Sequence, residues 1–244
     1  MASSTLIVIP TFNEADNVAS LVAAIRAVLP LVDVLVVDDA SPDRTAEVVK
    51  SAAARDERIH LMERSAKLGL GSAYVAGFQW GLERGYQRFF EMDADFSHDP
   101  RYLPAFVAQL DAGADVVVGS RNIAGGGIEG WGLGRHLLSR GGSLYSRLVL
   151  GVGVRDMTTG FKAYTRRALE RIDVARVRSN GYAFQVETTY RALRAGLRVV
   201  ELPIVFVDRR VGRSKMTRHE VREALLAVWA MRRFGRGKPG PCEP

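Results

Sequence analysis

Two acidic residues, Asp93 and Asp95, stand one residue apart at the end of the apolar segment 88–92. The segment predicts a short buried strand, and side chains two residues apart in an extended chain point to the same side. Two carboxylates held side by side repel one another unless a cation or a proton lies between them. Mg²⁺ or Mn²⁺ fits such a pair, because these ions prefer oxygen ligands and keep open positions for a substrate phosphate. The pair therefore indicates a divalent-metal site.

The same stretch also fits a purely structural role. In that interpretation Asp95, Ser97 or Asp99 caps a helix that begins at Pro100, and the acids belong to an ordinary polar loop. An Asp-x-Asp pair is too common to decide between the two interpretations by itself. The positions of the other polar residues favour a binding site.

Apolar, β-branched segments alternate with segments of helical periodicity over the first half of the chain. Strands are predicted at 5–9, 33–37, 59–62, 88–92 and 115–118, and helices at 15–28, 45–54, from 67–71 to 84, and at 101–110. Short connections between such elements predict an α/β fold. We expect a mainly parallel, doubly wound, Rossmann-like sheet with helices on both faces.

The polar residues that could bind a ligand follow the predicted strands. They are Glu14, Asp39, Lys67, Asp93, Asp95 and Arg121. Open α/β sheets bind ligands at the carboxyl ends of their strands, so this clustering favours a site at one sheet edge. Each residue also has a structural interpretation: Glu14 and Asp39 could cap the helices that follow them, and Arg121 could be a surface ion-pair residue.

The pattern changes after residue 121. A flexible glycine loop is expected at 125–127, and a polar turn at 156–161 precedes a short strand. Further elements are helices at 135–150, 182–195 and 218–233 and a strand at 199–207. The Gly/Pro-rich tail, residues 235–244, is expected to be disordered. We therefore predict one domain, residues 1–234, followed by a tail.

Composition narrows the classes of protein. The 244 residues carry a net charge of +7, which favours anionic partners such as nucleotides, phosphates and anionic lipids. A single cysteine, Cys242, excludes a disulfide framework and a cysteine-based metal site. The first residues lack a basic region, so no signal peptide is expected, and no apolar run approaches the roughly 20 residues that cross a bilayer. Nucleic-acid binding is disfavoured, because no motif for it is present.

Six ordered motifs carry a resemblance to a known family. They are Pro10-Thr11-Phe12-Asn13-Glu14, Val36-Val37-Asp38-Asp39-Ala40-Ser41-Pro42-Asp43, Asp93-Ala94-Asp95, Gly119-Ser120-Arg121, Thr159-Gly160-Phe161 and Gly212-x-Ser214-Lys215. Over residues 4–232 the chain resembles the inverting GT-A glycosyltransferases. More narrowly, it resembles the polyprenol (dolichol)-phosphate mannosyltransferases, or polyprenyl-phosphomannose synthases. Six motifs in this order are far more specific than any one of them.

The resemblance implies a nucleotide-sugar-binding half, residues 1–120, and an acceptor half, residues 121–234. It implies GDP-mannose as the donor, a polyprenyl (dolichyl) phosphate as the acceptor, and Mg²⁺ or Mn²⁺ as the cofactor. The donor-binding positions are Pro10, Phe12, Glu14, Val37, Asp39, Asp93, Ala94, Asp95, Arg121, Arg209 and Lys215. The metal positions are Asp93, Asp95 and Ser97, and the implied catalytic residues are Asp95, Arg121 and Arg209.

Two positions depart from the family pattern. Phe12 stands where tyrosine is common, which keeps the ring and removes a hydroxyl, and Ser97 stands where glutamine is often the third metal ligand. A serine hydroxyl or water would then complete the metal coordination. The donor stays open in one respect, because neither Asp39 nor Phe12 fixes the base or the sugar. A related transferase that uses another nucleotide sugar, such as UDP-glucose, is the alternative, followed by a non-enzymatic nucleotide-sugar-binding subunit.

The implied chemistry explains why cations recur in the second half. A phosphate monoester is largely ionised at neutral pH, so it needs no general base to attack the sugar. It needs cations that hold one anion close to another, and arginine grips phosphate through two hydrogen bonds. We expect Arg121, Arg135, Arg140 and Arg209 to bind the acceptor phosphate. The four histidines form no obvious catalytic pair, in agreement with this chemistry.

A lipid acceptor also requires contact with a membrane. Residues 135–150 and 218–236 combine arginines with apolar stripes, which is typical of helices that lie at an anionic membrane surface. The alternative is that these apolar faces simply belong to the core. We expect a peripheral protein on the cytoplasmic face of the membrane, with a membrane-anchoring partner subunit as a second route to the lipid.

Overall fold

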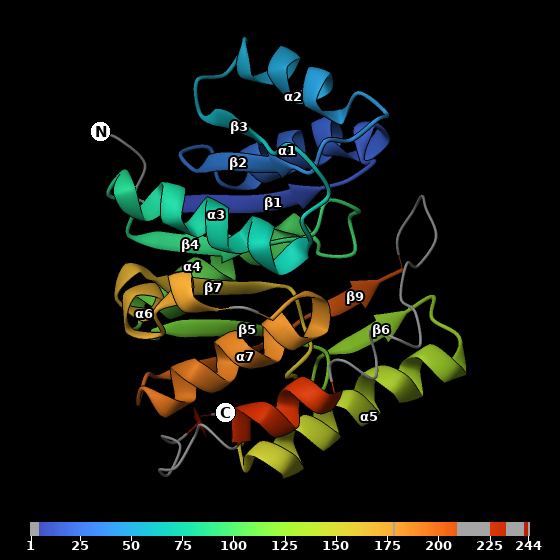
Figure 1. The fold of residues 1–244 in the computed structure, drawn as a ribbon, viewed down its shortest axis with the longest axis vertical. Coiled ribbons are helices and arrows are strands. Elements are labelled where there is room, and N and C mark those ends of the chain that lie inside the picture. The colour runs from blue at the N-terminus through green and yellow to red at the C-terminus, as the bar shows by residue number, and fades with distance from the viewer. Residues whose placement is uncertain (1–4, 178, 209–224, 233–241, 244) are drawn as a thin grey trace.

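The computed structural model describes residues 5–177, 179–208, 225–232 and 242–243, and its centre is a twisted eight-stranded sheet (Figure 1). The strand order is β10-β8-β5-β7-β4-β1-β2-β3, and β6 and β9 form a separate two-stranded sheet. The strands are β1 (Thr5–Thr11), β2 (Asp33–Asp38), β3 (Ile59–Glu63), β4 (Arg88–Glu91), β5 (Val116–Ser120), β6 (Gly127–Glu129), β7 (Lys162–Thr165), β8 (Val199–Pro203), β9 (Val205–Val207) and β10 (Cys242–Glu243).

Helices cover both faces of this sheet (Figure 1). They are α1 (Ala15–Val28), α2 (Thr45–Ala53), α3 (Leu70–Glu83), α4 (Leu103–Asp111), α5 (Leu133–Leu150), α6 (Arg166–Arg171) and α7 (Gly181–Arg194), with two short 3₁₀ helices at Pro100–Tyr102 and Val174–Arg176. Residues 225–232 form a further helical segment. The predicted α/β fold, with a mainly parallel, doubly wound sheet, is confirmed.

The strands are buried on both faces, which explains their unbroken apolar runs. In β1, Leu6 and Val8 face the core cluster that contains Phe78 of α3, whereas Ile7 and Ile9 face the cluster beneath α1 and α4. Alternate residues of an extended strand point to opposite faces, so one apolar strand supplies both layers.

The order of strands places a topological switch point at one edge of the sheet. β1 pairs in parallel with β2 on one side and with β4 on the other, so the chain reverses its direction of winding between β1 and β4. Ligands of open α/β sheets bind at such a switch point, outside the carboxyl ends of the strands. β7 runs antiparallel between β4 and β5. Its first residue therefore lies at this same edge, and it brings the turn 156–161 there.

The prediction of one strand at 199–207 is wrong. β8 ends at Pro203, and the chain then leaves the large sheet as β9, which pairs in parallel with β6. Proline lacks the N–H group that a continued ladder needs, and Gly127 of β6 donates its N–H to the carbonyl of Ile204. The expected flexible loop at 125–127 therefore ends in a strand.

The tail also differs from the expectation in one place. Cys242 and Glu243 pair in parallel with Val199 and Val200 at the edge of the sheet, whereas the rest of the tail lies outside the described residues. The predicted helix at 218–233 is described, and is helical, only over 225–232.

One ion pair is completely buried beneath the carboxyl edge of β4. Lys162 Nζ lies 3.4 Å from Glu91 Oε1, and neither side chain is exposed. The ammonium also donates to the carbonyl and side-chain oxygens of Gln185, both at 2.8 Å, and to Thr188 Oγ1. Burial raises the pKa of Glu91 to about 7 and lowers the pKa of Lys162, and each charge opposes the shift of the other.

We predict that Lys162→Met lowers the free energy of unfolding by about 3–5 kcal/mol, because it leaves the Glu91 carboxylate buried without its cation. The double variant E91Q/K162M should recover part of this loss, since no charge stays buried. Urea titration of both variants measures the effect. Glu170→Gln, which breaks the exposed pair with Arg166, is the matched control and should cost about 0–1 kcal/mol. A Lys162→Met protein as stable as the unmodified protein would contradict the prediction.

Candidate functional site

The loops after β1 and β2 are locked together at the carboxyl edge. The backbone N–H groups of Asn13, Glu14 and Ala15 donate to side chains of the β2–α2 loop, namely Ser41 Oγ, Thr45 Oγ1 and Asp43 Oδ2, each at 3.0 Å. Thr11 Oγ1 adds a bond of 2.8 Å to Asp38. The first turn of α1 is therefore capped by residues about thirty positions later in the chain.

The capping interpretation is correct in position for Glu14 and wrong for Asp39. Glu14 stands at the N-cap of α1, but its side chain makes no capping bond and accepts instead from the side-chain amide of Asn17. The N-cap residue of α2 is Arg44, not Asp39. Asp43 accepts hydrogen bonds at the starts of both helices. Its Oδ2 accepts from the N–H of Ala15 in α1, and its Oδ1 accepts from the N–H and the hydroxyl of Thr45 in α2.

Asp39 anchors a different loop. Its carboxylate pairs with Arg64 and accepts from the N–H groups of Leu68 and Gly69 at 3.0 and 3.2 Å. This anchoring holds Lys67 with its ammonium 4.3 Å from the centre of the Phe12 ring. A cation and an aromatic face thus lie together at the carboxyl edge of the sheet, which suits a planar base attached to phosphates.

The two acids after β4 occupy different environments. The Asp93 side chain is 37% exposed, and its Oδ1 accepts from Tyr74 at 3.3 Å. Asp95 is buried, and its Oδ1 accepts from the N–H of Ser97. The structure assigns the capping role to Asp99, which accepts from the N–H of Arg101 at the start of the 3₁₀ helix. Of the three candidates for that role, Asp95 and Ser97 are thus left for another function.

His98 holds the acid loop in shape. Its Nδ1 accepts from the N–H of Asp93 at 3.0 Å, and its ring stacks on Phe161 with centroids 4.9 Å apart. Burial lowers the pKa of His98 to about 4, so the ring is neutral at pH 7 and its nitrogen can act as an acceptor. The sequence offered no pair for this histidine, because its partners are a backbone group and an aromatic ring.

The residues present fit a divalent cation. The Ser97 hydroxyl is buried and has no hydrogen-bond partner among the described residues, which is costly unless a ligand satisfies it. Its loop also carries Asp93 and Asp95, so two carboxylates and one hydroxyl are available to an oxygen-preferring ion, with water completing its shell. Within the described residues no cluster of three or more His, Cys, Asp or Glu residues suits a metal. A metal ion bound by this loop must therefore take its remaining ligands from the Ser97 hydroxyl, from water or from substrate oxygens.

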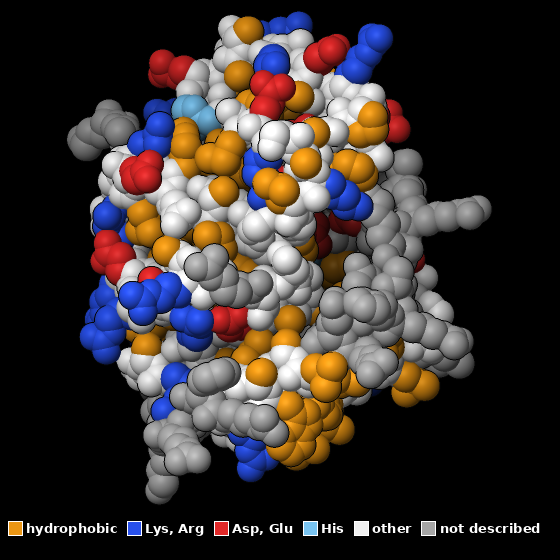
Figure 2. Space-filling model, viewed as in Figure 1, with side chains coloured by type: hydrophobic (Ala, Val, Ile, Leu, Met, Phe, Trp, Pro, Cys, Tyr) orange, Lys and Arg blue, Asp and Glu red, His pale blue; other side chains and the backbone are white. Residues whose placement is uncertain are grey.

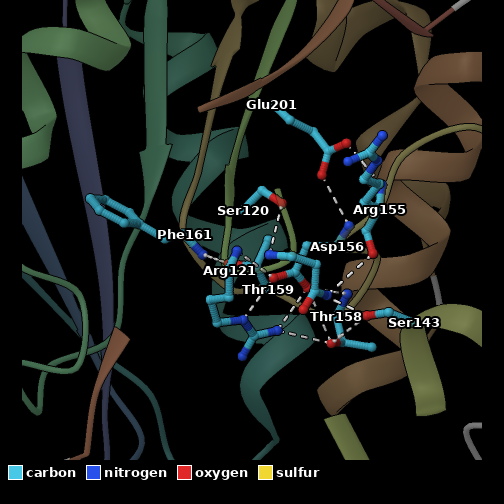
Figure 3. Close-up of polar contacts among 10 residues, drawn as sticks. Ser120, Arg121, Ser143, Arg155, Asp156, Thr158, Thr159, Phe161 and Glu201 are labelled. Carbon is cyan, nitrogen blue, oxygen red and sulfur yellow. Dashed lines mark hydrogen bonds and ion pairs between the residues drawn. The ribbon is translucent and has the colours of Figure 1, made fainter. Parts of the chain in front are cut away.

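Arg121, at the end of β5, makes a buried ion pair with Asp156 (Figure 3). Its Nε and Nη2 donate to the two carboxylate oxygens, both at 2.7 Å, and Nη2 also reaches Thr158 Oγ1 at 3.0 Å. Burial alone would lower the pKa of Arg121, but Asp156 raises it, while Arg121 lowers the pKa of Asp156 against the effect of burial. Arg121 is thus an ion-pair residue in the interior rather than at the surface.

The pair joins several elements of the second half (Figure 3). Ser143 of α5 bonds Thr158, and Glu201 of β8 accepts from the N–H groups of Arg155 and Asp156. The Arg121 guanidinium also lies 5.6 Å from the ring of Phe206, which packs 5.6 Å from His98. Phe206 therefore connects the Arg121 cluster with the acid loop.

The other predicted site residues are less concentrated. Val37 and Ala94 are buried in the core, so only their backbone groups are available to a ligand, while Pro10 is half-buried. Arg140 is exposed on α5, and Arg135 lies near the start of the same helix. Arg209 and Lys215 lie outside the described residues.

The apolar residues of α5 face outward. Leu137, Leu144 and Leu148 are 72%, 52% and 73% exposed, whereas Ser143 and Ser146 on the opposite face are buried. Exposed Leu226 and Trp229 of the segment 225–232 add to this surface, and Tyr145 donates to the Leu225 carbonyl between the two helices. Figure 2 shows hydrophobic side chains gathered at the lower end of the molecule, where these helices lie in Figure 1. The interpretation of this face of α5 as core is wrong.

Comparison with known proteins identifies the family of the chain. Residues 6–173 match the family described as "Glycosyl transferase family 2". The chain is 47% identical over 231 residues to "Polyprenol monophosphomannose synthase" of Mycolicibacterium smegmatis, covering 93% of this chain and 87% of the relative. It is 46% identical over 223 residues to "Undecaprenyl-phosphate mannosyltransferase" of Micrococcus luteus, covering 91% of each.

Solved structures support the fold. A mannosyltransferase from Pyrobaculum calidifontis, in complex with GDP-Man and Mn²⁺, superposes with a TM-score of 0.63 at 19% identity, over 99% of this chain and 67% of its own. The S. aureus TarS 1–349 structure with UDP-GlcNAc gives a TM-score of 0.60 at 14% identity, over 92% and 65% of the two chains. At such identities the likeness concerns the fold alone.

We predict that Asp156→Asn destabilises the protein by about 3–5 kcal/mol, because the Arg121 charge then stays buried beside a neutral amide. Thermal and urea unfolding measure the loss. The control is Asp173→Asn, which breaks an exposed pair with Arg176 and should change stability by less than about 1 kcal/mol. Equal effects of the two substitutions would show that burial of the Arg121 pair carries no special weight.

Proposed function

The chain belongs to glycosyl transferase family 2, and from that premise we propose that it transfers mannose from GDP-mannose to a polyprenyl phosphate with inversion. The observation that carries the proposal is the acid loop at the switch point between β1 and β4. It holds Asp93, Asp95 and a buried Ser97 hydroxyl that has no hydrogen-bond partner in the described part of the chain. The names of relatives that are nearly half identical over most of the chain supply the donor sugar and the lipid acceptor.

Asp93, Asp95 and Ser97 would hold Mg²⁺ or Mn²⁺. The bound ion would neutralise the negative charge that develops on the leaving diphosphate. Phe12 and Lys67 would flank the base, and the Asp39–Arg64 pair would keep the Lys67 loop in place. Asp93 is the more exposed of the two acids, so it is also available to the donor itself.

The acceptor side needs no general base, because the attacking phosphate is already ionised. In agreement with this, the Nδ1 atom of the buried, neutral His98 already accepts the N–H of Asp93, so this nitrogen is not available as a general base. Arg121 would contribute its positive charge to the site while its geometry is fixed by Asp156. The roles of Arg135, Arg140, Arg209 and Lys215 at the phosphates stay predictions from the sequence.

The experiment that tests the function is a donor screen. Purified protein, Mn²⁺ and a polyprenyl phosphate are incubated with radiolabelled GDP-mannose, GDP-glucose or UDP-glucose, and organic extraction recovers the lipid product. We expect label in the lipid phase from GDP-mannose. Label from UDP-glucose alone would support the related transferase, and no label from any donor would reject the proposal.

We predict that Asp95→Asn keeps the fold and loses at least about 100-fold in transfer rate, because a neutral amide holds the divalent cation poorly. Electron paramagnetic resonance of Mn²⁺ measures the loss of binding directly. Asp99→Asn is the control, because it lies on the same loop and asparagine still caps the 3₁₀ helix. Full activity of the Asp95→Asn protein in EDTA would contradict the metal site.

We also propose peripheral membrane binding through the exposed face of α5 and the segment 225–232. No described helix is long and apolar enough to cross a bilayer. The exposed leucines can insert at the interface, and basic residues such as Arg140 and Arg147 each add about 1 kcal/mol near an anionic surface. The side of the membrane, and any partner subunit, stay predictions.

We predict that the double substitution L137E/L148E abolishes flotation with anionic vesicles that contain polyprenyl phosphate. Two carboxylates would replace the inserting side chains and repel the surface. Leu31→Glu is the control, because Leu31 is equally exposed, at 72%, in the α1–β2 connection. If the double variant floats as the unmodified protein does, this face is not the membrane contact.

A further inference from the structure

A cavity of about 500 Å³ lies away from the acid loop, at the amino edge of the sheet. Helix α7 begins near the carboxyl edge and ends at Arg194, shortly before β8 starts at Val199. The second half of α7, the end of α6 and the segment 225–232, which lies beside α7 in Figure 1, surround this cavity. Its charged lining consists of three arginines and two acids, namely Arg171, Arg191, Arg194, Asp173 and Glu187.

Both acids of the cavity already have partners. Glu187 Oε1 lies 2.7 Å from the Nε and from the Nη2 of Arg191, one turn along α7. Asp173 Oδ2 lies 3.0 Å from Nε of Arg176. These two pairs neutralise one arginine of the lining and both of its carboxylates, so the remaining arginines determine the charge that a ligand would meet.

The remaining arginines are Arg171 and Arg194. Arg194 is half-buried, and its Nη1 atom is completely buried without a hydrogen-bond partner among the described residues. Arg171 donates one N–H to the carbonyl of Ala195 at 3.2 Å, and neither arginine has an ion-pair partner in the described part of the chain. A charged donor that is buried without a partner is costly. An anion in the cavity would satisfy it.

The shape and lining of the cavity indicate a phosphate that carries organic groups. Guanidinium groups hold phosphate through paired hydrogen bonds. A phosphate ion alone would fill little of this cavity, whose volume is typical of sites for whole small molecules. Apolar side chains complete the walls, because the nearly buried Ile172 and Tyr190 line the cavity together with Met231.

The cavity also borders the proposed membrane face. Met231 belongs to the segment 225–232, whose Leu226 and Trp229 are 62% and 50% exposed. Eight helical residues span only about 12 Å. A single lipid molecule is long enough to place its headgroup in the cavity and its acyl chains beside these exposed side chains.

We propose that this cavity binds the phosphate headgroup of an anionic membrane lipid, and that Arg194 and Arg171 hold the phosphate. The inference concerns neither the donor nor the acceptor of the proposed reaction, so it does not depend on sugar transfer. Such a site makes membrane attachment sensitive to anionic lipid at one defined place, in addition to the diffuse attraction of basic side chains to the surface.

Calorimetry with dihexanoyl phosphatidylglycerol, a soluble short-chain anionic lipid, tests the site. The unmodified protein should bind it saturably, and dihexanoyl phosphatidylcholine at least about tenfold more weakly. Arg194→Gln should weaken phosphatidylglycerol binding about tenfold, because it removes charge-assisted hydrogen bonds to the phosphate. If this variant does not fold, Arg171→Gln, which changes an exposed residue of the same lining, carries the test.

The matched control is Arg167→Gln. It removes the same charge from α6, but Arg167 is 67% exposed and does not line the cavity. Its affinity for the short-chain lipid should change less than about twofold. Equal losses in Arg167→Gln and Arg194→Gln, or no saturable binding by the unmodified protein, would overturn the proposal.

Flotation with vesicles distinguishes a lipid from free phosphate. Arg194→Gln should float less than Arg167→Gln with phosphatidylcholine vesicles that contain phosphatidylglycerol, and equally with pure phosphatidylcholine vesicles. Inorganic phosphate that binds as tightly as the short-chain lipid, together with unchanged flotation, would overturn the assignment to a lipid. L137E/L148E should bind the short-chain lipid as the unmodified protein does, which separates failure of the membrane face from failure of this site.

Discussion

The second half of the chain depends on one buried ion pair, between Arg121 and Asp156. Burying two charges is favourable only when each is fully satisfied, and here the guanidinium makes two bonds to the carboxylate and a third to Thr158. The same carboxylate accepts the N–H of Arg121, and Glu201 receives the N–H groups that precede the turn. Strand β5, helix α5 and strand β8 are thereby fixed relative to a turn that has no regular structure of its own.

A second buried polar layer lies directly under the acid loop. It consists of one residue each from β4, β7 and α7, namely Glu91, Lys162 and Gln185. They meet where the antiparallel strand β7 lies beside β4 in the otherwise mainly parallel sheet. An apolar contact there would leave the loop above it free to shift. Hydrogen bonds are directional, so this layer ties the position of Asp93, two residues after Glu91, to the first turns of α7.

The sequence predicted best those helices and strands whose structure depends mainly on their own residues. The apolar runs of β1 to β5 and the periodicity of the helices between them predicted the α/β fold, because burial on both faces needs unbroken Val and Ile segments. The exit of the chain from the sheet at Pro203 was missed, since Val205–Val207 continues the β-branched pattern and its partner strand, β6, lies in a glycine-rich loop. Likewise, helical periodicity grouped the leucines of α5 correctly but could not tell which face meets solvent.

The candidate site residues were likewise predictable only where the pattern of a single element indicated them. The acids, Asp39 and Arg121 were predicted as site residues from their places after strands. Asp156 and Gln185, which hold Arg121 and Lys162, were missed because their partners lie far away in sequence, 35 residues in the case of Arg121 and Asp156. Their importance comes from charge burial, which only the packed structure reveals.

The interlocked loops after β1 and β2 bear on the order of folding. The N–H groups of Asn13, Glu14 and Ala15, where the chain enters α1, are satisfied by Ser41, Thr45 and Asp43, so the start of this helix depends on residues of the next loop. Those partners arrive only after β2 has paired with β1, which closes a loop of about thirty residues. Strand pairing and helix initiation are therefore a single cooperative event, and a chain cut or still being synthesised before residue 41 would carry α1 with a frayed start.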